Sequence, residues 1–244
     1  MKAILDIGNS KIKIKIGDSI HSFHYLAKNE KEIIDLIISN NINKLFFSSV
    51  STQGLAFTKE IVTKINSEQA IELIDASLFL DAQNKVNFDN ITGMGNDRKF
   101  GLIAASYLAN PPIITIDCGT AITINILDEK KIALGGIIMT GSYTQAKALQ
   151  YFTSNLPEIE FELNNSICGN NTKDAINAGI NVATIGGIKY AVEQIQKFKL
   201  QNKSPNIFFT GGYGQDVMNR TCLNNSQFVE GLVILGIEKT INNL

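Results

Sequence analysis

One strand–turn–strand pattern occurs twice in this chain of 244 residues, and it constrains the fold more than any other feature. Residues 3–16 read AILDIGNSKIKIKI, and residues 113–127 read IITIDCGTAITINIL. In each copy an apolar run is followed by Asp-x-Gly, a small polar residue and a second run in which every other residue is Ile. This pattern is typical of a β-hairpin that has a buried first strand, a turn requiring glycine and a return strand with one buried face.

The distance between the two copies indicates two similar domains. Asp6 and Asp117 are 111 residues apart, about the size of one small domain. Small side chains at such turns let backbone N–H groups approach phosphate oxygens, and aspartates can hold a cation that bridges those oxygens. Either turn alone could be an ordinary hairpin in which Asp and Asn serve only the turn geometry. Two copies in register favour a nucleotide site.

Composition excludes several classes of protein. The chain is 44% hydrophobic and 18% charged, and its net charge of −1 comes without a Lys/Arg block, which argues against a nucleic-acid or membrane-surface partner. No apolar run reaches the length of a membrane span, and no signal peptide precedes the first strand, so we expect a cytoplasmic protein. Cys118, Cys168 and Cys222 lack C-x-x-C spacing and fit reduced thiols. With only His21 and His24, a histidine-based triad or multi-histidine metal site is disfavoured.

Periodicity predicts the element order βββαβαβ for the first half of the chain, which is the order of one lobe of the actin-like, ribonuclease-H-like fold. The predicted strands cover residues 2–8, 11–17, 20–26, 44–50 and 71–74, and the predicted helices cover about 29–40 and 55–66. For the rest we predict helices at 97–109, 142–151, 172–198 and 230–241, and strands at 113–117, 121–127, 131–138 and 206–210.

The expected fold is therefore α/β, with two ribonuclease-H-like (actin-like ATPase) domains. Each domain is expected to hold a mixed β-sheet flanked by helices, with a cleft between the domains. Pro111-Pro112 cannot continue the preceding helix and sets the expected boundary, which gives domains 1–110 and 111–244.

Two further clusters could carry chemistry. Gly95-Asn96-Asp97-Arg98 lies where an irregular loop enters a helix, although Asp97 could be only a helix N-cap. Thr210-Gly211-Gly212 follows an apolar strand and could pass under an adenine or ribose, or could be simple turn chemistry. The chain has no G-x-x-x-x-G-K-[ST], so the P-loop is not its nucleotide motif.

Taken together, the four clusters resemble the type III pantothenate kinases of the actin/hexokinase-like superfamily, over nearly the whole chain. The matching segments are Asp6–Ser10, Gly95–Arg98 (G-x-D-R), Asp117–Thr123 (D-x-G-T-A-x-T), Gly135–Gly141 (G-G-x-I-x-P-G), Thr153–Pro157 (T-x-x-L-P) and Asn171–Gly179 (N-T-x-x-A-x-x-x-G). Two positions depart from the family pattern: Thr140 stands where proline is usual, and Phe88 stands where the family often has tyrosine.

The resemblance implies that ATP donates its γ-phosphate to the 4′-hydroxyl of pantothenate, the first step toward coenzyme A. It implies Asp97 as the general base, Mg²⁺ held at Asp6 through the phosphates, and a monovalent cation (K⁺ or NH₄⁺) at Asp117. The implied ATP contacts are Asp6, Ile7, Gly8, Asn9, Ser10, Lys11, Ile12, Lys13 and Thr120. The implied pantothenate contacts are Phe88, Gly95, Asn96, Asp97, Arg98 and Thr172.

The resemblance also favours a homodimer in which the acceptor site is completed where two chains meet. Residues 76–96 are irregular, yet they carry Phe79, Leu80, Val86, Phe88 and Ile91, which is much apolar surface for a solvated loop. The predicted helix at 172–198 offers a second apolar face through Ile176, Ile180, Val182, Ile185, Ile188 and Val192. A monomer that folds both segments inward is the alternative.

Two other functions keep the same fold. One is a kinase of the same superfamily with another acceptor, such as a sugar, acetate or polyphosphate. The other is a non-catalytic accessory protein that binds a ligand without turnover. The Gly-x-Asp-Arg loop favours pantothenate over the first alternative, and the presence of Asp6, Asp97 and Asp117 argues against the second.

Overall fold

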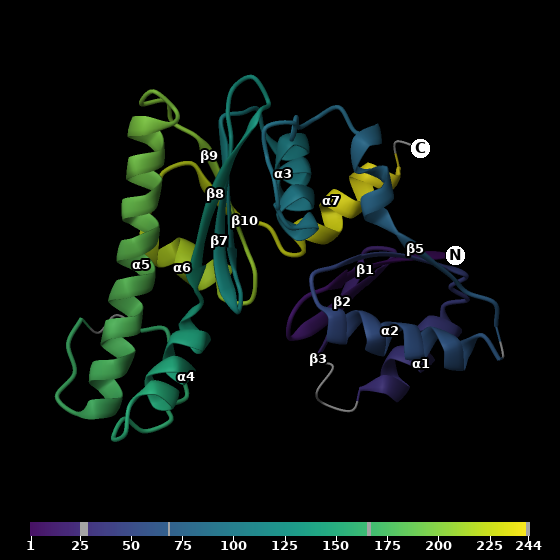
Figure 1. Cartoon of the computed structure of the whole chain (residues 1–244), viewed down its shortest axis with the longest axis horizontal. Helices are drawn as coiled ribbons and strands as arrows, with labels where there is room; N and C mark the ends of the chain where they lie inside the picture. The colour runs from purple at the N-terminus through teal and green to yellow at the C-terminus, as the bar shows by residue number, and fades with distance from the viewer. Residues whose placement is uncertain (25–28, 68, 165–166, 243–244) are drawn as a thin grey trace. The chain divides into compact units, whose positions relative to one another are not determined.

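The computed structural model describes residues 1–24, 29–67, 69–164 and 167–242. The chain divides into two compact units, one formed by Met1–Leu108 with Gly231–Leu244 and the other by Ala109–Glu230. Each unit contains one five-stranded mixed sheet with helices packed against it (Figure 1).

The first sheet has the strand order β3-β2-β1-β4-β5. Its strands are β1 (Lys2–Ile7), β2 (Lys11–Ile16), β3 (Ser19–His24), β4 (Lys44–Ser49) and β5 (Glu72–Asp75). β1, β2 and β3 are antiparallel neighbours, whereas β1, β4 and β5 run parallel. The sequence predicts that one face of β2 is buried, and this is confirmed because Ile12, Ile14 and Ile16 all lie in the core.

Two pairs of helices cover the two faces of this sheet (Figure 1). α1 (Glu30–Ser39) and α2 (Thr52–Ile65) contribute buried Ile and Val side chains to the core on the face of Ile12 and Ile14. On the opposite face lie α3 (Asn96–Leu108) and α7 (Leu232–Ile241), where Lys15 of β2 forms an ion pair with Glu238 of α7 at 2.6 Å. A short 3₁₀ helix, η1 (Ala76–Ala82), follows β5.

The second sheet repeats the topology of the first. Its strand order is β10-β9-β6-β7-β8, so in both sheets the central first strand pairs antiparallel with the second and parallel with the fourth. Its strands are β6 (Ile113–Cys118), β7 (Ala121–Leu127), β8 (Ala133–Thr140), β9 (Asn206–Thr210) and β10 (Ser226–Phe228). α5 (Thr172–Phe198) and α6 (Gly214–Thr221) pack on one face of this sheet, and α4 (Ser142–Phe152) packs against α5.

The predicted fold class is confirmed, since two mixed sheets of one topology are each flanked by helices. The structure adds α6 and β10, which the periodicity did not indicate. Residues 231–242, which the predicted division assigns to the second domain, pack with the first unit. In addition, residues 25–26 of the predicted strand 20–26 lie outside the described residues.

The C-terminal helix joins the first unit because of a close approach between two helices. A Cβ atom on Gly236 of α7 would lie 2.0 Å from the carbonyl oxygen of Phe100 in α3. Phe100 is itself fully buried. The missing side chain at 236 thus allows the two backbones to pack directly, a contact that no local sequence pattern reveals.

In the part of the chain that the structure describes, none of the helices combines the length and apolar character needed to cross a membrane.

Candidate functional site

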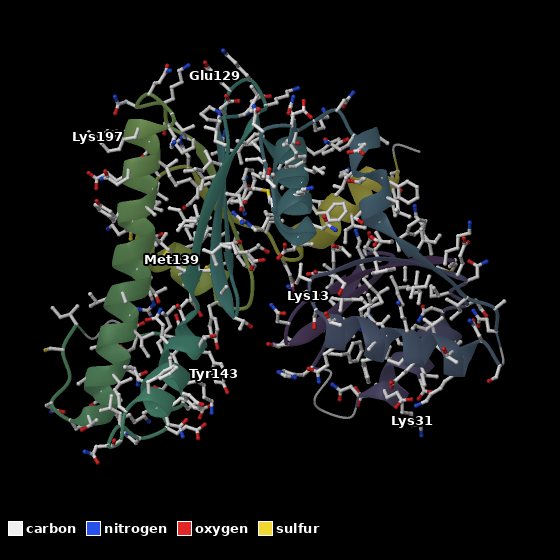
Figure 2. All side chains as sticks on the ribbon, in the orientation of Figure 1. Lys13, Lys31, Glu129, Met139, Tyr143 and Lys197 are labelled. Carbon is white, nitrogen blue, oxygen red and sulfur yellow. The ribbon has the colours of Figure 1, made fainter. Side chains whose placement is uncertain are left out.

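Asp6 lies at the carboxyl end of the central strand of the first sheet. The strand register places Lys13 beside it on β2 and Ser48 beside it on β4, so all three side chains project from the same face. The turn after β1 is closed by a hydrogen bond from the Gly8 N–H to the Lys11 carbonyl at 3.0 Å. Asp6 is half-buried, and Lys13 is labelled on this sheet in Figure 2.

The remaining residues of the predicted ATP segment fall into two groups. Ile7 and Ile12 face each other across the hairpin and are buried in the core, so their side chains are not available to a ligand. Asn9 and Lys11 are exposed at the turn, and Ser10 is half-buried. The local sequence thus produces a hairpin whose tip presents polar groups and backbone while its strands anchor it in the core.

Asp97 lies in the first turn of α3, where the irregular segment becomes helical. The backbone N–H of Arg98 donates to the Asp97 Oδ1 at 2.8 Å, and the N–H of Lys99 donates to the Gly95 carbonyl at 3.2 Å. A Cβ atom on Gly95 would lie 2.6 Å from the Asp97 Oδ1. Glycine at position 95 therefore leaves the space that the Asp97 carboxylate occupies.

Burial changes the acid–base properties of this pair. Desolvation raises the pKa of Asp97 above that of an ordinary aspartate, although the backbone hydrogen bond and the charge of Arg98 oppose the shift. Desolvation likewise lowers the pKa of the Arg98 guanidinium, against the favourable charge of Asp97. Asp97 is consequently a stronger base than a solvated carboxylate, which is the property that proton abstraction requires.

Phe88 is brought close to the Asp97 turn through Lys99. The Lys99 Nζ lies 5.7 Å from the centroid of the half-buried Phe88 ring, a cation–π distance. Asn96 is the first residue of α3. The substrate residues that the sequence predicts at positions 88 and 95–98 thus form one local group in the first unit.

In the second unit, Asp117 occupies the position equivalent to Asp6, at the carboxyl end of the central strand. The register places Thr123 of β7 on one side of it and Thr210 of β9 on the other. Gly211, whose φ is +92°, follows directly, and a Cβ atom there would lie 2.4 Å from the Asp117 Oδ1 and 2.5 Å from the Cys118 carbonyl oxygen. The Thr-Gly-Gly cluster therefore packs against the Asp117 turn, which requires glycine at 211.

Cys118 is the last residue of β6, next to Asp117, and its side chain is buried. Desolvation and then the charge of Asp117 raise the pKa of its thiol far above the ordinary range, so it stays protonated and inert as a nucleophile.

Thr120 is held by the segment that starts α4. Its carbonyl accepts hydrogen bonds from the Gly141 N–H at 3.1 Å and the Thr144 hydroxyl at 2.8 Å. A Cβ atom on Gly141 would lie 2.1 Å from the Gly119 carbonyl oxygen, so the glycine allows α4 to begin against the turn. At the position where the family usually has proline, the Thr140 carbonyl accepts a hydrogen bond from the Gln145 side chain at 2.9 Å.

Thr172 is the first residue of α5 and is exposed. Asn171 caps the helix by accepting a hydrogen bond from the Asp174 N–H at 3.0 Å. Thr172 lines a pocket of about 500 Å³ with Leu156, Gly169 and Ile176, among others. It belongs to the second unit, whereas Gly95–Arg98 belong to the first.

The donor chemistry of both turns fits cations. Among residues 1–24, 29–67, 69–164 and 167–242, no group of three or more His, Cys, Asp or Glu side chains gathers as a metal site. Mg²⁺ in phosphoryl-transfer enzymes is usually held by one or two carboxylates together with substrate phosphates, so the single carboxylate of Asp6 suits it. At Asp117 the carboxylate oxygen and the Cys118 carbonyl oxygen both lie beside Gly211, and oxygen donors of these kinds are the ones that hard cations take.

Ser48 is a polar residue beside the site that sequence reasoning missed. It is buried on β4 next to Asp6 in the strand register. Its position depends on parallel pairing between strands about forty residues apart, and a single sequence carries no local signal of that pairing.

Comparison with known proteins shows the family to which the sequence belongs. The family model described as type III pantothenate kinase matches residues 3–194. A type III pantothenate kinase from Sulfurihydrogenibium sp. (strain YO3AOP1) is 29% identical in an alignment 252 positions long, which covers 96% of this chain and 96% of its own. Another from Dehalococcoides mccartyi is 30% identical over 86% of this chain and 85% of its own.

Solved structures share the fold. A Campylobacter jejuni protein described as a Baf family transcriptional activator has a TM-score of 0.61 at 24% identity, covering 98% of this chain and 97% of its own. A Sinorhizobium meliloti protein described as a 2-dehydro-3-deoxygalactonokinase has a TM-score of 0.56 at 10% identity, covering 100% and 97%. These likenesses concern the fold, whereas the family model spans most of the sequence, and this chain belongs to the type III pantothenate kinase family.

Proposed function

We propose that this enzyme transfers the γ-phosphate of ATP to the 4′-hydroxyl of pantothenate, with Asp97 as the general base. The observation that supports this most is the Asp97 carboxylate itself. It lies at a loop-to-helix junction in space left by Gly95, and burial raises its pKa. A carboxylate of raised pKa takes a proton from an acceptor hydroxyl more readily than a solvated one.

Neighbouring residues would orient the acceptor. The Arg98 guanidinium, adjacent to the base, suits the carboxylate of pantothenate because it can donate two parallel hydrogen bonds. Phe88 would pack against the apolar part of the substrate, its ring held by Lys99. Thr172 would supply a further hydroxyl contact from the start of α5.

The two glycine turns would bind ATP. Backbone N–H groups at Asn9–Lys11, on the turn that Gly8 closes, and the Lys13 ammonium would contact phosphate oxygens, and Thr120 would provide a contact from the second turn. Mg²⁺, when bound with ATP at Asp6, would neutralise charge that develops on the transferred phosphoryl group. Cys118, Cys168 and Cys222 are thiols and not parts of disulfides, which fits the reducing, cytoplasmic setting expected from the sequence.

The direct test is ADP release measured with pantothenate, acetate or glucose as the acceptor. Turnover with pantothenate alone supports the proposal, and a preference for acetate or glucose would replace it with another kinase of the superfamily. Absence of ADP release with every acceptor, in protein that still binds a ligand, would support an accessory role.

Activity is expected to require a monovalent cation that acts through Asp117. Asp117→Ala should weaken ATP binding and remove the difference between K⁺ and a bulky tetraalkylammonium salt, because the carboxylate would hold the cation that offsets phosphate charge. Initial rates and ATP titrations in both salts measure this. Glu193→Ala is the control, because Glu193 is an exposed carboxylate on α5, and this variant should keep the wild-type K⁺ dependence. Equal wild-type activity in the two salts would contradict the assignment.

A homodimer is also part of the proposal, although many of the apolar residues that the sequence offers for the contact are buried. Leu80 and Val86 of the 76–96 segment are buried, as are Ile188 and Val192 of α5. Val182 of the predicted helix face is 53% exposed, and the other exposed apolar side chains of the second unit include Tyr143 (50%), Tyr151 (81%), Phe152 (80%) and Tyr190 (65%). Tyr143 and Met139 are labelled in Figure 2. A pocket of about 490 Å³ between α4 and α5 adjoins Phe152.

An aromatic surface of this kind is typical of a buried interface. We therefore place the dimer contact on the α4–α5 surface, defined by Tyr143, Tyr151, Phe152, Val182 and Tyr190. Thr172 lies on the same helix as Val182, so a partner chain seated here would bring a second subunit close to a predicted substrate residue.

Light scattering at micromolar concentration should give twice the chain mass of 26.7 kDa. Phe152→Glu should shift the protein toward the monomer, because a charge would replace an aromatic side chain in the contact. Phe198→Glu is the matched control, since Phe198 is 67% exposed at the other end of α5. A wild-type monomer that phosphorylates pantothenate would show that one chain is sufficient.

A further inference from the structure

Ser48 has an unusual environment for a serine. Its side chain is 1% exposed, and its hydroxyl has no hydrogen-bond partner among the residues that the structure describes. Buried hydroxyl groups are nearly always hydrogen-bonded, so an exception calls for a physical explanation, such as a partner that arrives with a ligand.

The adjacent serines on the same strand end are accounted for by the fold. The Ser49 hydroxyl donates to the Ser51 carbonyl at 2.9 Å and accepts from the Ser51 N–H at 3.2 Å. The Ser51 hydroxyl in turn caps α2 by accepting from the Gly54 N–H at 3.0 Å. Ser49 and Ser51 thus build the turn from β4 into α2, whereas Ser48 takes no part in it.

The position of Ser48 relates it to the predicted phosphate site. In the parallel pair of β1 and β4, Ser48 is opposite Asp6, and residues paired in this way project from the same face of the sheet. On the other side of β4, β5 ends one step earlier, with Asp75 opposite Phe47. Asp6 is therefore the neighbour that the sheet presents to the Ser48 side chain.

The end of β4 also reaches the Asp97 turn. Val50, two residues after Ser48, has its Cγ1 atom 3.9 Å from the position of a Cβ on Gly95. The N–H of Val50 donates to the Ile7 carbonyl at 3.1 Å, next to Asp6. β4 thus connects the predicted ATP turn and the predicted acceptor loop inside one compact unit, and Ser48 is the buried polar group on that connection.

We propose that Ser48 is a positioning residue for Asp6, and that its hydroxyl donates a hydrogen bond to the Asp6 carboxylate when Mg²⁺ and nucleotide are bound. An ionised carboxylate only accepts hydrogen bonds, and a serine hydroxyl can rotate to supply one. A donor of this kind fixes the orientation of a carboxylate that faces a cation, and losing such a donor typically lowers metal affinity by about 10–100-fold. The inference rests on the proposed role of Asp6 in holding Mg²⁺ through the phosphates.

The test measures nucleotide binding without turnover, from the shift of the unfolding midpoint as ATP is titrated with and without Mg²⁺. Ser48→Ala should weaken Mg·ATP binding by about 10–100-fold and leave binding of Mg-free ATP unchanged. Without nucleotide its midpoint should equal or exceed that of the wild type, because no existing hydrogen bond is lost. Ser48→Cys keeps the volume but donates weakly, so it should resemble Ser48→Ala and not the wild type.

Ser49→Ala is the matched control and should behave in the opposite way. It removes two hydrogen bonds that the structure contains, so the midpoint should fall while the effect of Mg²⁺ on ATP binding stays that of the wild type. A fall in the midpoint for Ser48→Ala without loss of Mg·ATP affinity would mean that Ser48 is only structural, and would overturn the proposal. Recovery of affinity in Ser48→Cys would assign the effect to packing, and would also overturn it.

Asp6→Asn distinguishes a failure of the proposed role of Asp6 from a failure of the proposed role of Ser48. If it leaves Mg·ATP binding unchanged, the proposed role of Asp6 fails, and the inference fails with it. If Asp6→Asn weakens binding and Ser48→Ala does not, only the inference fails. If Ser48 acts through Asp6, adding Ser48→Ala to Asp6→Asn should cause no further loss of Mg·ATP affinity, whereas independent roles would give additive losses.

Discussion

Asp97→Asn is expected to lower kcat by roughly 10²–10⁴-fold, the range typical of the loss of a general base. Asparagine keeps the shape and can still accept the hydrogen bond from the Arg98 N–H, so the loop geometry should persist. Steady-state ADP release with pantothenate measures the effect. Asp81→Asn is the control, since Asp81 is an exposed carboxylate in η1, and it should retain wild-type turnover. Unchanged kcat in Asp97→Asn would reduce Asp97 to a helix cap.

The same variant has a distinct effect on stability, because burial raises the pKa of Asp97 in the folded chain. A carboxyl whose folded pKa exceeds its unfolded value stabilises the protein at pH below the unfolded pKa, and this contribution disappears as pH rises through the folded pKa. Asparagine does not titrate. The stability of Asp97→Asn relative to the wild type should therefore increase with pH across that interval and then level off.

Urea unfolding at a series of pH values measures this difference. The acid limb of the wild-type pH–rate profile should also lie above the range of an ordinary aspartate, since the base is active only when ionised. A variant that loses stability relative to the wild type as pH rises would contradict the burial-induced shift.

The sequence predicts most of the fold where the signal is local. Alternating Ile residues and Asp-x-Gly turns specify both hairpins, β1–β2 and β6–β7, and the structure confirms them in equivalent places in two sheets of the same topology. α6 and β10 were missed for a physical reason. α6 has eight residues, most of them polar, and β10 has three, so both are too short for their few apolar residues to reveal a period.

At the candidate site, the sequence alone could not show which residues are brought together by the pairing of strands that are far apart in the chain. The sequence presents Thr210-Gly211-Gly212 and Asp117 as separate clusters, and only the parallel pairing of β6 with β9 brings them together. Ser48 reaches Asp6 in the same way, through the pairing of β1 with β4. The chemical roles of these residues remain predictions from family resemblance and local geometry, which the variants above test.

The packing of the C-terminal helix predicts a large loss of stability when Gly236 is replaced. α7 packs on α3, the helix that carries Asp97, and the contact depends on the absence of a side chain at Gly236. A methyl group there would lie 2.0 Å from the backbone oxygen of Phe100. Because the atom it meets belongs to the backbone, the clash cannot be relieved by rotating a side chain and requires one helix to move. Gly236→Ala is therefore expected to destabilise the first unit by about 3 kcal/mol, the upper part of the usual range for overpacking.

Gly101→Ala is the matched control, because it makes the same substitution on the partner helix. A Cβ atom at Gly101 would meet no atom within 4 Å in the described part of the chain. Removing a glycine from a helix interior should then stabilise the protein by about 0.5–1 kcal/mol. Urea midpoints of the two variants should move in opposite directions, and Gly236→Ala should also lose turnover, because a displaced α3 moves Asp97. A rise in both midpoints would contradict the close contact between α7 and α3. It would also mean that α7 does not position the helix that carries the proposed base.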